Sequence, residues 1–244
     1  MKYLYLFVFV LIFSSCYRNK YVEINGSMPG VNNGAVIIKS QDGAQLVSEF
    51  ITGGKFHAKA LLQMRGFYDL FIVPDIANQN HDKKLYEMYL EAGNYTITVD
   101  RDKLYLYPKI QSESKAQNQL SDYYTIALQK QHAMLKQKDS IGDLLYGPNT
   151  LVVIKSPQYY TLLKQLEDAK TKADNALAKV LSDYITKNPQ NDVEAFLMSQ
   201  SDYQKYPKDY YSIYQKFTDE QKKTPIGQQE GDDLSQLVKG GGGK

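Results

Sequence analysis

Tyr21-Val22-Glu23-Ile24-Asn25 alternates apolar and polar side chains, as a half-buried β-strand does. This stretch ends at Gly26 and Pro29-Gly30. The turn Asn32-Asn33-Gly34 then leads into a second strand-like stretch, Ala35-Val36-Ile37-Ile38-Lys39. Because both breaks have the chemistry of tight turns, a hairpin is predicted at each. The N-terminal half of the chain is therefore expected to consist of short strands.

Further strands are predicted downstream at the same spacing. Eight short strands separated by turns predict an antiparallel β-sandwich or barrel-like domain, which we assign to residues 16–111. The polar stretch 75–83 is expected to be an exposed loop. The further strands are predicted at residues 45–51, 55–61, 67–73, 85–91, 95–99 and 104–110.

After Gln111 the apolar period changes from two residues to between three and four, which predicts helices. Two long helices are expected to pack as an antiparallel pair, the second beginning at Ser156-Pro157 and ending at Asn188-Pro189. Shorter helices are predicted at 192–205, 207–222 and 226–238. The fold class is therefore α+β, with an all-helical domain at 112–239 and a flexible tail at 240–244. The apolar faces of the long pair are Leu120, Tyr124, Ala127, Gln131, Met134, Ile141 and Leu145, and Leu162, Leu166, Ala169, Ala173, Ala176, Val180 and Tyr184.

The residues that precede the first strand have the pattern of a bacterial lipoprotein leader. Lys2 is basic, residues 3–13 are apolar, and Ser14-Ser15 precede Cys16, the only cysteine in the chain. The pattern resembles a lipobox, although Phe13 stands where leucine is commonest. The resemblance implies that the signal peptide 1–15 is removed and that Cys16 is acylated, for example with palmitate. A start-transfer anchor and an ordinary secretory signal are the alternatives, but the apolar run is shorter than the roughly 20 residues of a membrane-spanning helix.

The leader sets the expected location and removes one class of chemistry. In bacterial lipoproteins, an aspartate directly after the lipidated cysteine often signals retention in the inner membrane. Here Tyr17 to Lys20 follow Cys16, so the resemblance implies an outer-membrane lipoprotein that faces the periplasm. Once Cys16 carries lipid, no cysteine remains for a disulfide, a thiolate metal ligand or a redox thiol. The 29 basic and 27 acidic residues nearly balance, so a nucleic-acid partner is not expected.

Most of the chain after the leader resembles a domain of unknown function found in bacterial lipoproteins, usually placed before a thioredoxin-like domain. The resemblance implies the fold and the envelope location. In that family the cysteines of the thioredoxin-like domain carry the redox chemistry, and this chain has no residues to match them, so redox activity is not expected. The resemblance is carried by Val22 to Gly26, Gly54 to Ala58, Tyr89 to Val99, Ile185 to Pro189 and Thr224 to Gly227.

No catalytic, metal or cofactor motif is found in the sequence. His57, His81 and His132 do not share a ligand-like spacing. Neither a serine nucleophile elbow nor a phosphate-binding glycine loop occurs in the required context. Carboxylates such as Asp168, Asp174 and Asp183 stand among lysines and are interpreted as a solvated helix face. The chain is therefore expected to be non-enzymatic and to need no cofactor.

Tyrosines are the one unusual chemical feature, since the chain has 21 of them and no tryptophan. Five of them, Tyr203, Tyr206, Tyr210, Tyr211 and Tyr214, recur at three- and four-residue steps in the helical part. They are interpreted either as core packing between helices or as an aromatic surface for a glycan, peptide or protein.

The expected function is that of a lipid-anchored envelope protein acting as a binding or scaffold module. Two alternatives stay open. The first is an accessory partner of a separate thioredoxin-like thiol-disulfide oxidoreductase, which the family resemblance suggests. The second is a glycan or small-ligand binder that uses the tyrosine surface.

Overall fold

The computed structural model describes residues 21–78, 84–146, 157–189 and 193–240. Cys16, the whole predicted leader, His81 and residues 241–244 of the predicted tail lie outside these ranges. The chain divides into two compact units, Met1–Ser121 and Asp122–Lys244. The α+β class predicted from the sequence is confirmed, because the strands come first and the long helices follow.

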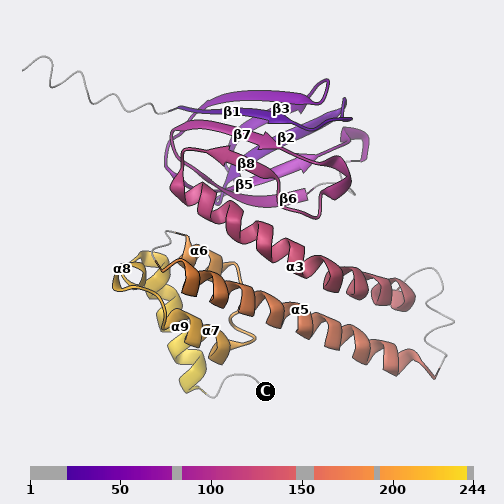
Figure 1. Cartoon of the computed structure of the whole chain (residues 1–244), viewed down its shortest axis with the longest axis vertical. Coiled ribbons are helices and arrows are strands. Elements are labelled where there is room, and N and C mark those ends of the chain that lie inside the picture. The colour runs from indigo at the N-terminus through magenta and orange to yellow at the C-terminus, as the bar shows by residue number, and fades with distance from the viewer. Residues whose placement is uncertain (1–20, 79–83, 147–156, 190–192, 241–244) are drawn as a thin grey trace, which may run out of the picture. The chain divides into compact units, whose positions relative to one another are not determined.

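The first unit is a sandwich of two four-stranded sheets (Figure 1). One sheet has the strand order β4-β1-β7-β8 and the other has the order β3-β2-β5-β6. Neighbouring strands run antiparallel except β1 and β7, which are parallel. The strands are β1 (Tyr21–Ser27), β2 (Gly34–Ser40), β3 (Gln45–Ile51), β4 (Lys55–Leu61), β5 (Gly66–Val73), β6 (Lys84–Leu90), β7 (Gly93–Thr98) and β8 (Lys109–Ser112), with short 3₁₀ helices η2 (Ile76–Asn78) and η3 (Arg101–Lys103).

Alternating burial along the strands builds the core between the two sheets. In β1, Val22 and Ile24 are fully buried while their neighbours face outward. Gly26 makes room for the ring of Phe56, its partner across β1 and β4. A Cβ at residue 26 would lie only 1.8 Å from Cζ of that ring, so any larger residue would displace the ring.

The predicted hairpin between the first two strands is wrong. The breaks at Gly26 and Pro29-Gly30 do not return the chain to its own sheet, because β1 and β2 belong to different sheets. The connection buries Met28 and Val31, and Gly54 receives a hydrogen bond from Met28 N at its carbonyl oxygen (2.7 Å). Local turn chemistry predicted the break, but burial of the connecting side chains decides which strand pairs with which.

The predicted strand 104–110 is also mostly wrong, since β8 begins only at Lys109. Residues 101–106 form η3 and a turn instead. Tyr107 is 8% exposed, and its hydroxyl donates to the carbonyl oxygen of Glu87 at 2.5 Å. Pro108 follows and has no N–H to offer a strand partner. The apolar side chains of this stretch therefore belong to an irregular segment that packs against β6, not to a strand.

Two long helices dominate the second unit, α3 (Lys115–Tyr146) and α5 (Tyr159–Lys187). The unit boundary falls within α3, between Ser121 and Asp122. From Asp122 onward the two helices are antiparallel (Figure 1), because the start of α3 meets the end of α5 through the rings of Tyr123 and Tyr184. At their other ends Ile141 and Leu145 pack with Ala169. Among the described residues, no helix has both the length and the apolar character that a membrane span requires.

Four shorter helices follow α5; the first two contact α5, and the other two pack against these. The predicted helix 207–222 is split in two, because Thr218 caps a new helix with a capping box that includes Gln221. Gly231 lets Tyr214 lie against the last helix, since a Cβ there would be 2.3 Å from the tyrosine hydroxyl. The helices are α6 (Glu194–Ser199), α7 (Pro207–Tyr214), α8 (Asp219–Lys222) and α9 (Pro225–Lys239).

Candidate functional site

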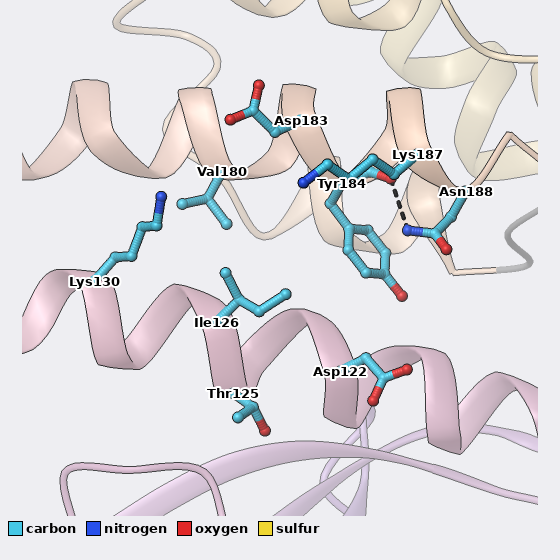
Figure 2. Close-up of a pocket in the computed structure, with 9 residues that line it drawn as sticks. All are labelled: Asp122, Thr125, Ile126, Lys130, Val180, Asp183, Tyr184, Lys187 and Asn188. Carbon is cyan, nitrogen blue, oxygen red and sulfur yellow. Dashed lines mark hydrogen bonds between the residues drawn. The ribbon is translucent and has the colours of Figure 1, made fainter.

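A groove of about 370 Å³ lies between the start of the helical unit's α3 segment and the end of α5 (Figure 2). The lining positions recur at three- and four-residue steps on both helices, so each helix offers one continuous face. From α3 the groove is lined by Asp122, Thr125, Ile126 and Lys130; from α5 and its cap it is lined by Val180, Asp183, Tyr184, Lys187 and Asn188.

An apolar strip runs along the groove. Figure 2 shows Ile126 of α3 opposite Val180 and Tyr184 of α5. Val180 and Tyr184 are 5% and 7% exposed, and the Tyr184 ring is fixed by an edge-on contact with Tyr123 at 5.5 Å. Ile126 is 43% exposed, so a large apolar side chain remains open to solvent beside a rigid floor. This is the arrangement of a partly desolvated anchor point.

Charged side chains of both signs flank the strip. Within the described parts of the chain, no hydrogen bond or ion pair engages the side chains of Asp122, Lys130 or Lys187. Asn188 closes the end of α5, with its Nδ2 donating to the carbonyl oxygen of Tyr184 at 2.9 Å. The groove therefore combines an apolar centre with unengaged cations and an anion at its margins.

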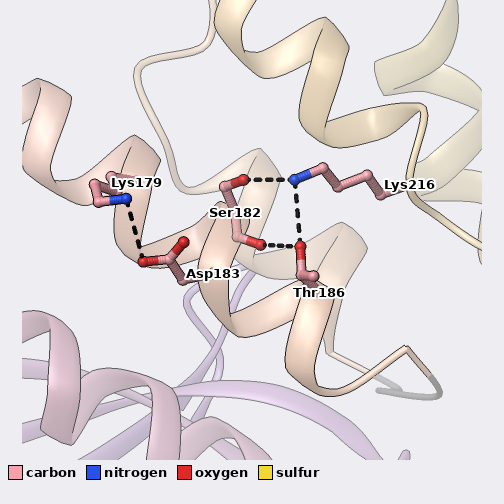
Figure 3. Close-up of polar contacts among 5 residues, drawn as sticks. All are labelled: Lys179, Ser182, Asp183, Thr186 and Lys216. Atoms are coloured by element: carbon pink, nitrogen blue, oxygen red, sulfur yellow. Dashed lines mark hydrogen bonds and ion pairs between the residues drawn. The ribbon is translucent and has the colours of Figure 1, made fainter.

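The outer side of α5 is held by polar contacts (Figure 3). Lys216 Nζ donates to the hydroxyl oxygens of Ser182 at 2.8 Å and Thr186 at 3.2 Å. These two hydrogen bonds attach the segment after α7 to α5, so the helix that lines the groove is supported from its other side. Asp183, which lines the groove, forms an ion pair with Lys179 of the same helix at 3.7 Å.

Asp174 was predicted to lie on a solvated carboxylate face, but its side chain makes specific hydrogen bonds. Its Oδ2 accepts hydrogen bonds from Lys205 Nζ at 2.9 Å and from the Tyr206 hydroxyl at 3.3 Å. The hydrogen bond with Tyr206, and then the one with Asp174, raises the pKa of Lys205 above its usual value. Asp174 therefore joins α5 to the segment that leads into α7.

The five predicted tyrosines have different environments rather than one shared surface. Tyr210 is 3% exposed, and the hydroxyl of Tyr203 donates to Asp233 Oδ2 at 3.1 Å. Tyr206 is occupied by Asp174 as described above. Tyr211 and Tyr214 are half-buried and stack at 6.5 Å with an angle of 25° between their rings. Tyr214 also contacts Phe217 at 5.4 Å, and Lys222 Nζ lies 5.6 Å from the centre of its ring.

His57 and His132, the histidines among the described residues, lie in different elements. His57 Nδ1 lies 2.9 Å from Asn25 Oδ1 across β1 and β4, and His132 lies on α3. In the part of the chain that the structure describes, no three histidine, cysteine, aspartate or glutamate side chains form a cluster able to hold a metal ion. Cys16, the predicted lipidation site, lies outside the described residues.

The groove itself was missed from the sequence. Ile126 lies outside the apolar face predicted for the first long helix, and this departure from the period is the available signal.

Comparison of the chain with protein-family models finds no match, and no curated protein matches it either. The groove presents half-exposed Ile126 between charged side chains of both signs.

Proposed function

We propose that this chain is a non-enzymatic, lipid-anchored cell-envelope protein that acts as a binding or scaffold module. In this proposal acylated Cys16 holds the protein on the outer membrane, facing the periplasm. The sandwich is a rigid platform, and the helical unit carries the binding surface. The observation that supports the proposal most is the groove between α3 and α5, with half-exposed Ile126 at its centre.

The chemistry of the groove favours a segment of another protein as its occupant. A volume of about 370 Å³ is at the small end for a compact ligand site, and the groove is open along two helices. An amphipathic helix or extended peptide could place one apolar side chain beside Ile126 and Val180. Carboxylates on that segment would meet Lys130 and Lys187, whose ammonium groups are unengaged in the described structure.

A crosslinking experiment in the native envelope tests this proposal. A photo-crosslinking amino acid replaces Ile126 in the full-length protein, and the matched control carries it at Lys136, an exposed position on α3 outside the groove. The Cys16→Ala protein is the unanchored control. We expect one defined envelope protein to crosslink at position 126 and not at position 136, and only when the anchor is present. Equal or absent crosslinking at both positions, or turnover of a substrate by the purified protein, would contradict the proposal.

The identity of the crosslinked protein separates the main proposal from the first alternative. A thioredoxin-like protein at position 126 would favour the accessory role in thiol-disulfide exchange. A transporter or an assembly component would favour the scaffold role.

The second alternative, a glycan or small-ligand binder, has the stacked pair Tyr211 and Tyr214 in its favour. Paired rings of this kind offer flat apolar faces next to polar hydroxyls. A glycan library screened by thermal shift tests it, because a ligand at 100 times its dissociation constant stabilises a fold by about 2.7 kcal/mol. A shift that disappears in Tyr211→Ala would support this role.

A further inference from the structure

The end of the sandwich at which β1 begins carries exposed apolar side chains. Tyr21, Leu61 and Met64 are 51%, 53% and 76% exposed, and we call them the Tyr21 surface. Tyr21 and Leu61 are partners across β1 and β4, so they lie side by side, and Met64 follows shortly after β4. Neighbouring large apolar side chains on a surface mark a site that meets a partner or a membrane.

The Tyr21 surface is held in place by the fold. Leu62 is 8% exposed and anchors the loop that follows β4. The hydroxyl of Tyr68 donates to the backbone carbonyl oxygen of Met64 at 2.7 Å. The loop is therefore fixed while the Met64 side chain remains in solvent. Beside Leu61 and Met64, a hollow of about 440 Å³ opens between the start of β3 and the end of β4.

Basic side chains accompany the apolar ones. Lys59 Nζ lies 5.6 Å from the centre of the Tyr21 ring, and Arg65 is exposed next to Met64. The nearby carboxylate of Asp42 accepts hydrogen bonds from the Ser40 hydroxyl and the Ala44 N–H within its own turn. Tyrosine together with lysine and arginine is the combination found where proteins meet the headgroup region of a bilayer.

The length of the tether places this end of the sandwich near the membrane, an argument that rests on the proposed lipid anchor. Four residues separate Cys16 from Tyr21, where β1 begins. An extended chain covers at most about 3.6 Å per residue, so Tyr21 lies within roughly 18 Å of the acylated cysteine. A seven-residue strand such as β1 is about as long as that distance. The sandwich therefore has to sit close to the lipid at the end that carries Tyr21.

We propose that the Tyr21 surface docks onto the bilayer and orients the sandwich on the membrane. Tyr21, Leu61 and Met64 enter the headgroup region beside the anchor, and Lys59 and Arg65 contact lipid phosphates. The acyl chains attach the protein, and the Tyr21 surface fixes which end of the sandwich faces the lipid.

Tryptophan fluorescence tests this directly, because the chain has no tryptophan of its own. The Met64→Trp protein is prepared full-length and acylated, and is placed in vesicles of phosphatidylethanolamine and phosphatidylglycerol with brominated acyl chains. Phe50→Trp is the matched control, since Phe50 is 71% exposed and lies at the far end of β3 from the hollow. Both positions are exposed, so neither substitution disturbs the core.

We expect the Met64→Trp emission to shift to the blue and to be quenched several-fold more strongly than that of Phe50→Trp. Equal quenching of the two proteins, or none, in an acylated preparation that stays on the vesicles would overturn the docking surface and leave the anchor intact. Absence of the acyl group by mass spectrometry would instead overturn the proposed anchor, and this inference with it.

Discussion

Gln117, in the first turn of α3, accepts a hydrogen bond at its Oε1 from the backbone N–H of Tyr89 in β6, at 2.7 Å. The same side chain is 0% exposed, and its Nε2 donates to Ser121 Oγ at 2.8 Å and Tyr107 Oη at 3.3 Å. Every polar atom of the amide is thus engaged inside the first unit. These contacts join the first turns of α3 to the sandwich, and Gln117 lies in the same unit as β6.

Replacing Gln117 with methionine is expected to destabilise the sandwich by about 1–3 kcal/mol. Methionine has a similar length but is a poor acceptor for the part-buried Tyr89 N–H and cannot donate to Ser121 or Tyr107, and the loss of such hydrogen bonds costs about that much. Urea unfolding followed by circular dichroism measures the change. Gln111→Met, at an exposed position of β8, serves as the control and should stay within about 0.5 kcal/mol of the parent protein. Equal effects from the two substitutions would show that the buried amide has no special role.

Gly26→Ala is expected to destabilise the sandwich by about 1–3 kcal/mol through overpacking. The added methyl would lie 1.8 Å from Cζ of Phe56, which is itself 6% exposed and cannot swing into solvent without leaving the core. The same alanine substitution made in a Phe56→Ala protein should add almost nothing, because the obstructing ring is gone. A cost that persists in that background would point to the strand backbone rather than to the ring.

The sequence predicted elements well where one local pattern dominates. Seven of the eight predicted strands overlap observed strands along most of their length, because alternation fixes which residues face the core. The long antiparallel helices were also predicted, and Leu120, Ala127 and Leu145 are buried as their spacing indicates. The apolar face predicted for the first helix begins at Leu120 and does not include Gln117. A glutamine is not expected to be buried, but here backbone and hydroxyl partners satisfy its amide.

Long-range pairing explains what was missed. The connection after β1 has the residues of a turn, yet burial of Met28 and Val31 carries the chain across to the other sheet. The groove depends on which side of α5 faces α3 and which side faces α6 and α7, and both sides of α5 are apolar in part. Val180 was predicted to face its partner helix. The groove also requires Ile126, which lies outside the apolar face predicted for the first long helix.

The ion pair between Asp174 and Lys205 is expected to give a favourable coupling that exceeds the coupling of a fully exposed pair. Its oxygen and nitrogen lie 2.9 Å apart, and the Asp174 side chain is 21% exposed. A double-mutant cycle with Asp174→Ala and Lys205→Met measures the coupling free energy. The pair Lys179–Asp183 provides the control, because at 3.7 Å and with side chains 75% and 50% exposed it should show a coupling close to zero. Similar coupling in both cycles would contradict the expectation.

Glu230 on α9 should make the stability of the helical unit fall with rising pH. Its side chain is 2% exposed, and within the described residues neither carboxyl oxygen has a hydrogen-bond partner. Burial, with a smaller contribution from the charge of Asp233, raises the pKa of Glu230 from 4.5 to about 8. The folded protein therefore keeps a proton that the unfolded chain loses between these values. Burial also raises the pKa of Tyr203 and of Tyr214 above 10, so neither phenol titrates in this range.

The substitution Glu230→Gln removes this titration while keeping the shape of the side chain. Near pH 5 the parent and the variant should unfold at similar urea concentrations, because Glu230 is then neutral in the folded state. From pH 5 to about pH 8 the parent should lose stability relative to the variant, and above pH 8 the difference should level off at roughly 3–5 kcal/mol in favour of the variant. Urea unfolding at intervals across this range measures the difference. If the two proteins kept a constant offset at every pH, Glu230 would have to be ionised in the folded protein throughout, and its burial would then be offset by solvent or by a partner.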